Sequence, residues 1–210
     1  MFDLLQGVLS SLGRKYVMAA TGFLLGVFLI FHAAGNSTLF QGKAAFNGYA
    51  AQLHSLGPLV SIAEVLLFGI FVLHIIFGVS LFWTNQKARS TRYAVARSAG
   101  GETWGSRTMP WTGLIVFFFL LLHLSNVRFV EPGLFIADVV EQTLTYPLYT
   151  VFYLFGITAL VLHISHGFWS LLQTLGLYHP RSTSLVRNGA RLLAALICLV
   201  FTAIIALLWL

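Results

Sequence analysis

The chain has 210 residues, of which 58% are hydrophobic and 9% are charged. This composition excludes a water-soluble globular protein, because too few polar side chains are present to cover its surface. The formal net charge of +6 would suit nucleic acid, but the basic residues lie beside long apolar segments, which indicates membrane topology instead.

Five apolar segments follow one another along the chain, at 16–36, 58–84, 110–128, 147–172 and 190–210. Because a membrane-spanning helix needs about 20 apolar residues, each segment is long enough to cross a bilayer. The sequence therefore predicts an all-α integral membrane protein with five transmembrane helices in one domain, 1–210. The remaining loops are too short to fold a soluble catalytic domain, so chemistry on a polar substrate would belong to a partner subunit.

Basic residues are distributed unevenly among the loops. Most lie before the first segment, between the second and third, or between the fourth and fifth: Arg14, Lys15, Lys87, Arg89, Arg92, Arg97, Arg107, Arg181, Arg187 and Arg191. Only Lys43 and Arg128 fall on the opposite side. By the positive-inside rule this asymmetry predicts a cytoplasmic N-terminus, with the acidic third loop outside. The basic face would also suit an acidic soluble partner, although orientation and lipid contact explain most of it.

Each of the first four segments contains a histidine whose depth in the membrane can be predicted: His32, His74, His123 and His163. His32 and His123 lie late in helices that run outward, whereas His74 and His163 lie about 24 Å below the outer boundary by helical rise. Two imidazoles at one depth on facing helices can ligate a haem iron, so the pattern predicts a bundle holding two stacked haems. The lone cysteine, Cys198, leaves no covalent attachment motif, which makes them b haems. Taken singly, each histidine could instead be a packing residue or cavity liner.

Four sequence stretches extend this interpretation: SSLGRKYVMAATG at 10–22, FHAAGN at 31–36, HIIFG at 74–78 and HISHGFWS at 163–170. Together they resemble the di-haem cytochrome b membrane anchor of succinate:menaquinone oxidoreductases and menaquinol:fumarate reductases. The resemblance implies that His32 and His123 bind the distal haem and that His74 and His163 bind the proximal haem.

The same resemblance implies partners and a location. Menaquinone would react near the outer side, and an iron–sulfur subunit would dock on the cytoplasmic loops. A flavoprotein with FAD would convert succinate and fumarate, and the complex would lie in the bacterial cytoplasmic (inner) membrane. Some di-haem fumarate reductases that resemble this chain carry a glutamate where Val161 stands, so a compensating proton path is in doubt.

Further polar residues are candidate contacts for the haems. His166 lies three residues after His163 and could also ligate iron, but the resembled H-x-x-x-G pattern selects His163 and leaves His166 as a propionate or cavity contact. Other candidate contacts at helix ends are Arg14, Ser125, Asn126 and Arg128. For Arg14, snorkelling to the membrane interface is the simpler interpretation.

Glu64 is the only carboxylate within the predicted spanning segments. Acidic residues inside membranes are functional candidates, so one hypothesis places Glu64 beside an outer quinone pocket, where it exchanges protons. The alternative is that it caps or pairs with a neighbouring polar group.

Two other functions remain open at this stage. One is a cytochrome b anchor of the nitrate reductase or formate dehydrogenase type. The other is a transporter whose histidines line a proton path, although such a path would place them at graded depths and not in level pairs.

Overall fold

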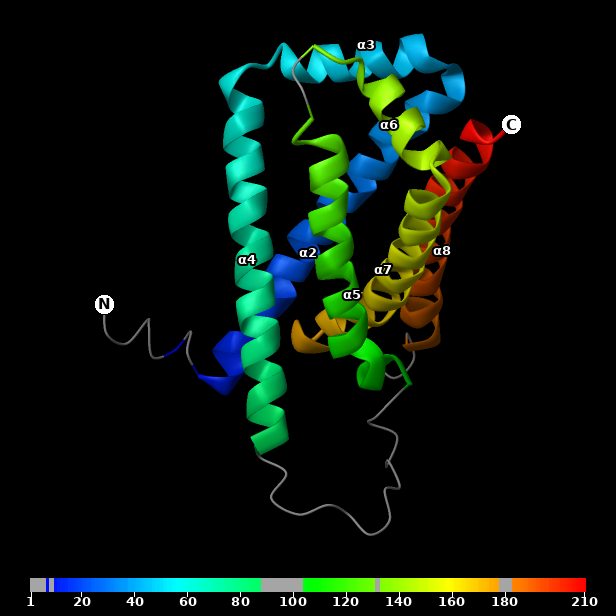
Figure 1. Ribbon diagram of the computed structural model, residues 1–210. Helices are drawn as coiled ribbons and strands as arrows, with labels where there is room; N and C mark the ends of the chain where they lie inside the picture. Colours follow the sequence, from blue (N-terminus) through cyan, green and yellow to red (C-terminus); the bar gives the residue numbers. More distant parts are fainter. Residues whose placement is uncertain (1–6, 8–9, 88–103, 131–132, 178–182) are drawn as a thin grey trace.

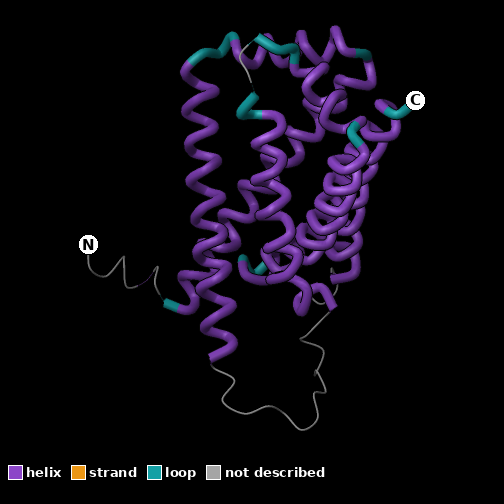
Figure 2. The backbone as a smooth tube through the Cα atoms, viewed as in Figure 1, coloured by secondary structure: helices purple, strands orange, loops and turns teal. Residues whose placement is uncertain are grey.

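Residues 7, 10–87, 104–130, 133–177 and 183–210 are described by the computed structural model, and within them the secondary structure is entirely helical (Figures 1 and 2). Five helices are long and apolar enough to cross a membrane: α2 (Ser11–Asn36), α4 (Pro58–Lys87), α5 (Trp104–Val127), α7 (Pro147–Thr174) and α8 (Thr183–Leu208). The predicted number of spanning helices is confirmed. The basic residues Arg89, Arg92, Arg97 and Arg181 lie outside the described residues.

Three spanning helices begin earlier than hydropathy predicted: α2 at Ser11, α5 at Trp104 and α8 at Thr183. The first turns of all three helices carry polar residues, so an apolar pattern alone misses them. At α2 and α7, individual residues mark the start of the helix. The Ser10 hydroxyl accepts a hydrogen bond from the Gly13 N–H at 3.0 Å and caps α2, and Pro147 begins α7.

Two short helices lie together at the end of the bundle that also holds the C-terminus (Figure 1). They are α3 (Lys43–His54) and α6 (Ile136–Thr145), and the 3₁₀ turn η1 (Ser37–Gln41) connects α2 to α3. We call this end of the molecule the capped end and the other the open end. These segments were expected to be loops, because their apolar stretches are too short to span a bilayer. α6 instead buries one face, including Ala137, Val140 and Leu144.

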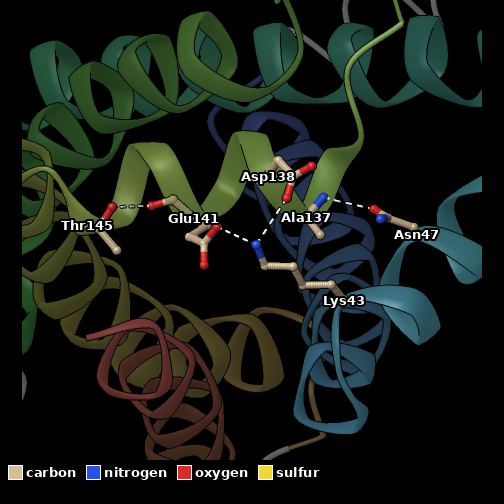
Figure 3. A network of polar contacts seen from close by, with 6 residues as sticks. All are labelled: Lys43, Asn47, Ala137, Asp138, Glu141 and Thr145. Carbon is tan, nitrogen blue, oxygen red and sulfur yellow. Dashed lines mark hydrogen bonds and ion pairs between the residues drawn. The ribbon is translucent and has the colours of Figure 1, made fainter. Parts of the chain in front are cut away.

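Polar contacts join α3 to α6 (Figure 3). The Lys43 ammonium donates to Asp138 at 3.1 Å and to Glu141, and the two carboxylates raise its pKa above the ordinary value. The Asn47 side-chain oxygen accepts from the Ala137 N–H at 3.0 Å, which satisfies a free amide at the start of α6. Because the lysine and its partners are largely exposed, the ion pairs contribute orientation more than stability.

The apolar core is concentrated near the capped end. Its buried members come from η1, α3, α6, α7 and α8: Leu39, Phe46, Ala137, Val140, Leu144, Tyr153, Ile157, Ile204 and Ile205. α8 packs chiefly against α7, and its small residues Ala190 and Ala194 are each 1% exposed. α4, by contrast, packs chiefly against α2 and has no buried residue along its length. The histidine-bearing helices α2, α4 and α5 are therefore less tightly enclosed than α7.

A glycine permits the close contact between α5 and α7. A β-carbon at Gly156 would lie 3.0 Å from the β-carbon of Phe119 and closer still to its ring. We expect Gly156→Ala to lower the free energy of unfolding by about 1–3 kcal/mol through overpacking, seen as a lower thermal midpoint in detergent. Gly26→Ala on α2 is the matched control, since nothing lies within 4 Å of its β-carbon position. Equal midpoints for the two variants would contradict the predicted overpacking.

Candidate functional site

The four histidines form two facing pairs. His32 on α2 and His123 on α5 have ring centroids 5.9 Å apart and planes at 87°. His74 on α4 and His163 on α7 have centroids 6.3 Å apart and planes at 73°. We call these the cap-side pair and the deep pair, because His74 and His163 lie farther along their helices from α3 and α6. The structure thus brings together the residues that the depth argument matched.

In the deep pair, a threonine on the neighbouring helix contacts each imidazole. The Thr21 hydroxyl donates to the Val17 carbonyl at 2.8 Å and lies 3.1 Å from Nδ1 of His74. A hydroxyl has one proton to donate, so with that proton on its own helix the oxygen accepts from Nδ1–H. This tautomer leaves the Nε2 lone pair of His74 free to bind a metal.

The same arrangement recurs at His163. The Thr112 hydroxyl donates to the Thr108 carbonyl at 3.0 Å and lies 3.2 Å from Nδ1 of His163. Both threonines are buried, at 5% and 6% exposure, so little water can compete for these contacts. Both imidazoles of the deep pair are therefore held in the orientation that a metal ligand requires.

A glycine follows each of these threonines and makes room for the imidazole. A β-carbon at Gly22 would lie 3.2 Å from Cε1 of His74, and one at Gly113 would lie 3.2 Å from Cε1 of His163. Any larger residue at either position would push against the ring.

The sequence analysis missed these residues, although the sequence contains a signal for them. Met18, Thr21, Gly22 and His32 recur at identical spacing as Met109, Thr112, Gly113 and His123, and Pro58, His74 and Gly78 recur as Pro147, His163 and Gly167. An internal comparison of the two halves would have found both threonines.

The cap-side pair is held differently. Phe28 stacks on His32 with centroids 5.3 Å apart, and Phe119 stacks on His123 at 5.9 Å. Nδ1 of His123 is buried without a hydrogen-bond partner, and the Asn36 amide lies 3.5 Å from Nε2 of His32. Aromatic packing, more than hydrogen bonding, orients these rings.

The other predicted site residues are dispersed. Arg14 donates to Ser80 at 2.9 Å and to Thr84 at 3.0 Å, while its Nε is buried without a partner. His166 lies against Gly105 at the open end of α5, away from the cap-side pair. Ser125 is exposed, and its hydroxyl donates to the carbonyl of its own helix at 2.9 Å.

Glu64 and Arg128 form a two-pronged ion pair that joins α4 to the end of α5. Nε and Nη2 of Arg128 donate to the two carboxylate oxygens at 3.0 and 2.9 Å, which raises the pKa of Arg128. The Glu64 side chain is 42% exposed. Pairing with a neighbouring polar group is therefore confirmed, and the proton role of Glu64 beside a quinone pocket stays a prediction.

A cavity of about 230 Å³ lies at the capped end, where α5, α6 and α7 meet. Asn126 lines it, and its side-chain nitrogen is buried without a hydrogen-bond partner. The cavity wall combines apolar and polar residues: Asn126, Val130, Leu134, Val139, Gln142, Thr143 and Tyr149. Amide and hydroxyl groups beside an apolar surface suit a flat ligand that carries hydrogen-bond acceptors.

The histidine pairs fit a haem iron. No group of three or more histidine, cysteine or acidic side chains gathers around a common point within the described part of the chain. A haem iron needs only two axial ligands from the protein. With metal–nitrogen bonds of about 2 Å, the centroids of two opposed imidazoles lie about 6 Å apart, close to both observed separations. The steep angles between the two ring planes are also compatible with binding one metal. Each metal–nitrogen bond lies in the plane of its own ring, so the two rings can be rotated relative to each other about these bonds.

Comparison with known proteins gives one relative. Over 161 residues the chain is 28% identical to the succinate dehydrogenase cytochrome b558 subunit of Bacillus subtilis (strain 168), and the match covers 75% of this chain and 77% of that subunit. No protein-family model and no solved structure matches the chain significantly.

The glycines beside the deep pair provide a test of its geometry. We expect Gly113→Leu to displace the His163 imidazole from Thr112 and to abolish haem binding at the deep pair, measured as haem per chain in the purified protein. Gly69→Leu on α4 is the control, because it is exposed and nothing lies within 4 Å of its β-carbon position. Full haem content in the Gly113 variant would show that the contact does not position the ring.

Proposed function

We propose that this chain is the membrane anchor and electron-transfer subunit of a succinate dehydrogenase or fumarate reductase complex, located in a bacterial cytoplasmic (inner) membrane. The observation that carries the proposal is the presence of two facing histidine pairs, one of which has Nδ1 of both rings in contact with a threonine hydroxyl, which leaves Nε2 for metal binding. The name of the Bacillus relative supports the same class of complex.

In this proposal each pair holds one b haem. His32 and His123 ligate one, and His74 and His163 ligate the other. Bound b haems supply reversible one-electron chemistry. The protein contributes fixed imidazoles, an apolar surround that limits water, and polar groups near the helix ends. Of these groups, Arg14 has a buried Nε that lacks a partner, which suits a haem propionate.

The charge distribution supports docking at the open end. Six described basic residues lie there on α2, α4, α5 and α8: Arg14, Lys15, Lys87, Arg107, Arg187 and Arg191. At the capped end, Lys43 and Arg128 are both paired with carboxylates. We therefore place the open end and the N-terminus in the cytoplasm. An iron–sulfur subunit would dock there and connect the chain to a flavoprotein with FAD.

The capped end is the proposed site of menaquinone chemistry. The cavity beside Asn126 offers amide and hydroxyl groups next to an apolar wall, as a quinone headgroup requires. Glu64 lies at the same end of the bundle, where its pair with Arg128 is partly exposed. We propose that the Glu64 carboxylate exchanges protons between quinone and the external side.

The haem assignment predicts how histidine variants group. We expect about two b haems per chain in the wild type by pyridine haemochrome, with the same haem lost in His32→Ala and His123→Ala. The other haem should be lost in His74→Ala and His163→Ala, since each iron needs both of its ligands. His54→Ala, in an exposed position, is the control. Well-folded wild-type protein without haem would overturn the assignment and favour a histidine-lined transporter.

The proton role predicts a selective defect. Glu64→Gln keeps the shape of the side chain but cannot release a proton, so quinone-linked turnover of the complex should fall by about 100-fold or more. Both haem spectra should remain. Arg128→Gln removes the partner charge and leaves the carboxylate, so it should retain more activity than Glu64→Gln. Unchanged turnover in the Glu64 variant would exclude the proton role.

A further inference from the structure

The two histidine pairs differ in how their imidazoles are hydrogen-bonded. In the deep pair, Nδ1 of both rings contacts a buried threonine hydroxyl, at 3.1 and 3.2 Å. In the cap-side pair, Nδ1 of His123 has no partner and the polar neighbour of His32 lies at Nε2. Helices α2 and α5 each supply one threonine to the deep pair and one histidine to the cap-side pair. The two pairs therefore differ in hydrogen bonding although both helices take part in each.

The direction of the hydrogen bond follows from the threonine's own helix. Thr21 and Thr112 each donate to a carbonyl four residues earlier. With the hydroxyl proton in that bond, each oxygen accepts from the ring. A hydrogen bond accepted from Nδ1–H makes the imidazole a stronger electron donor through Nε2. Stronger donation stabilises the oxidised metal relative to the reduced metal.

Two further features support a specific role for the threonines: the imidazole lies close to the helix that supplies each threonine, and the arrangement occurs twice in the chain. The adjacent glycine lets each ring come near the helix that supplies the threonine, and the threonine–glycine pair occurs twice at the same distance before a cap-side histidine. In each half of the chain, the first spanning helix therefore orients the deep histidine of the second.

We propose that Thr21 and Thr112 are positioning residues that fix the tautomer of His74 and His163 and lower the reduction potential of the haem at the deep pair. This inference rests on the proposed function, because it concerns a haem bound there. Neither threonine touches the iron; both act through the imidazoles.

The test is a redox titration of the purified, haem-loaded full chain, followed by absorbance and electron paramagnetic resonance. Thr21→Val and Thr112→Val keep the branched shape and remove the acceptor, whereas Thr21→Ser and Thr112→Ser restore it. Thr158→Val is the matched control, because the Thr158 hydroxyl also donates to a carbonyl four residues earlier, at 2.8 Å, and is exposed with no contact to an imidazole. The two haems are assigned first from His32→Ala and His74→Ala.

We expect each valine variant to raise the potential of the deep haem, or to weaken its retention by about 10- to 100-fold, while the cap-side haem is unchanged. The serine variants should return the deep haem to wild-type values. Haem present with unchanged potential and retention in both valine variants, or serine variants that behave like valine, would overturn this inference alone. Absence of haem from the wild type would overturn the proposed function as well.

Discussion

The structure depends on how a neutral imidazole is accommodated among apolar helices. Each ring has two nitrogens, and leaving either unsatisfied in a low-dielectric interior is costly. At His74 and His163 one nitrogen is satisfied by a threonine whose proton is already committed to its own helix. The second nitrogen is then left with a free lone pair. The glycines beside the threonines and the spacing of the helices follow from this requirement.

Four of the five spanning helices form two similar halves, α2 with α4 and α5 with α7, which share the threonine–glycine and histidine positions. The environment distinguishes the halves. α8 packs chiefly against α7, which is well buried, whereas α4 contacts chiefly α2 among the described elements and has no buried residue. Equivalent positions also diverge: Glu64 on α4 forms an exposed ion pair with Arg128, while Tyr153, at the corresponding position of α7, belongs to the apolar core. The two halves therefore have the same ligand geometry in different surroundings.

The two ends of the bundle are chemically different. At the capped end, α3 and α6 close over the apolar core, and Lys43 joins them (Figure 3). Arg128 is paired with Glu64 at the same end. At the open end, basic residues lie on four helices, α2, α4, α5 and α8. Under the proposed function, this polarity would give electron transfer a direction, with a cavity of about 230 Å³ at one end and a basic face for a partner at the other.

The sequence by itself determined the five spanning helices, because about 20 apolar residues in a row have no other stable arrangement in a bilayer. It also determined which histidines meet, because helical rise converts residue number into depth. Only the tertiary structure decided that α3 and α6 cap the bundle, that Glu64 pairs with Arg128, and that Thr21 and Thr112 hold the deep pair but not the cap-side pair. These contacts join residues far apart in the chain, and they depend on how far each helix is rotated and how closely its neighbour approaches, which no periodic pattern specifies.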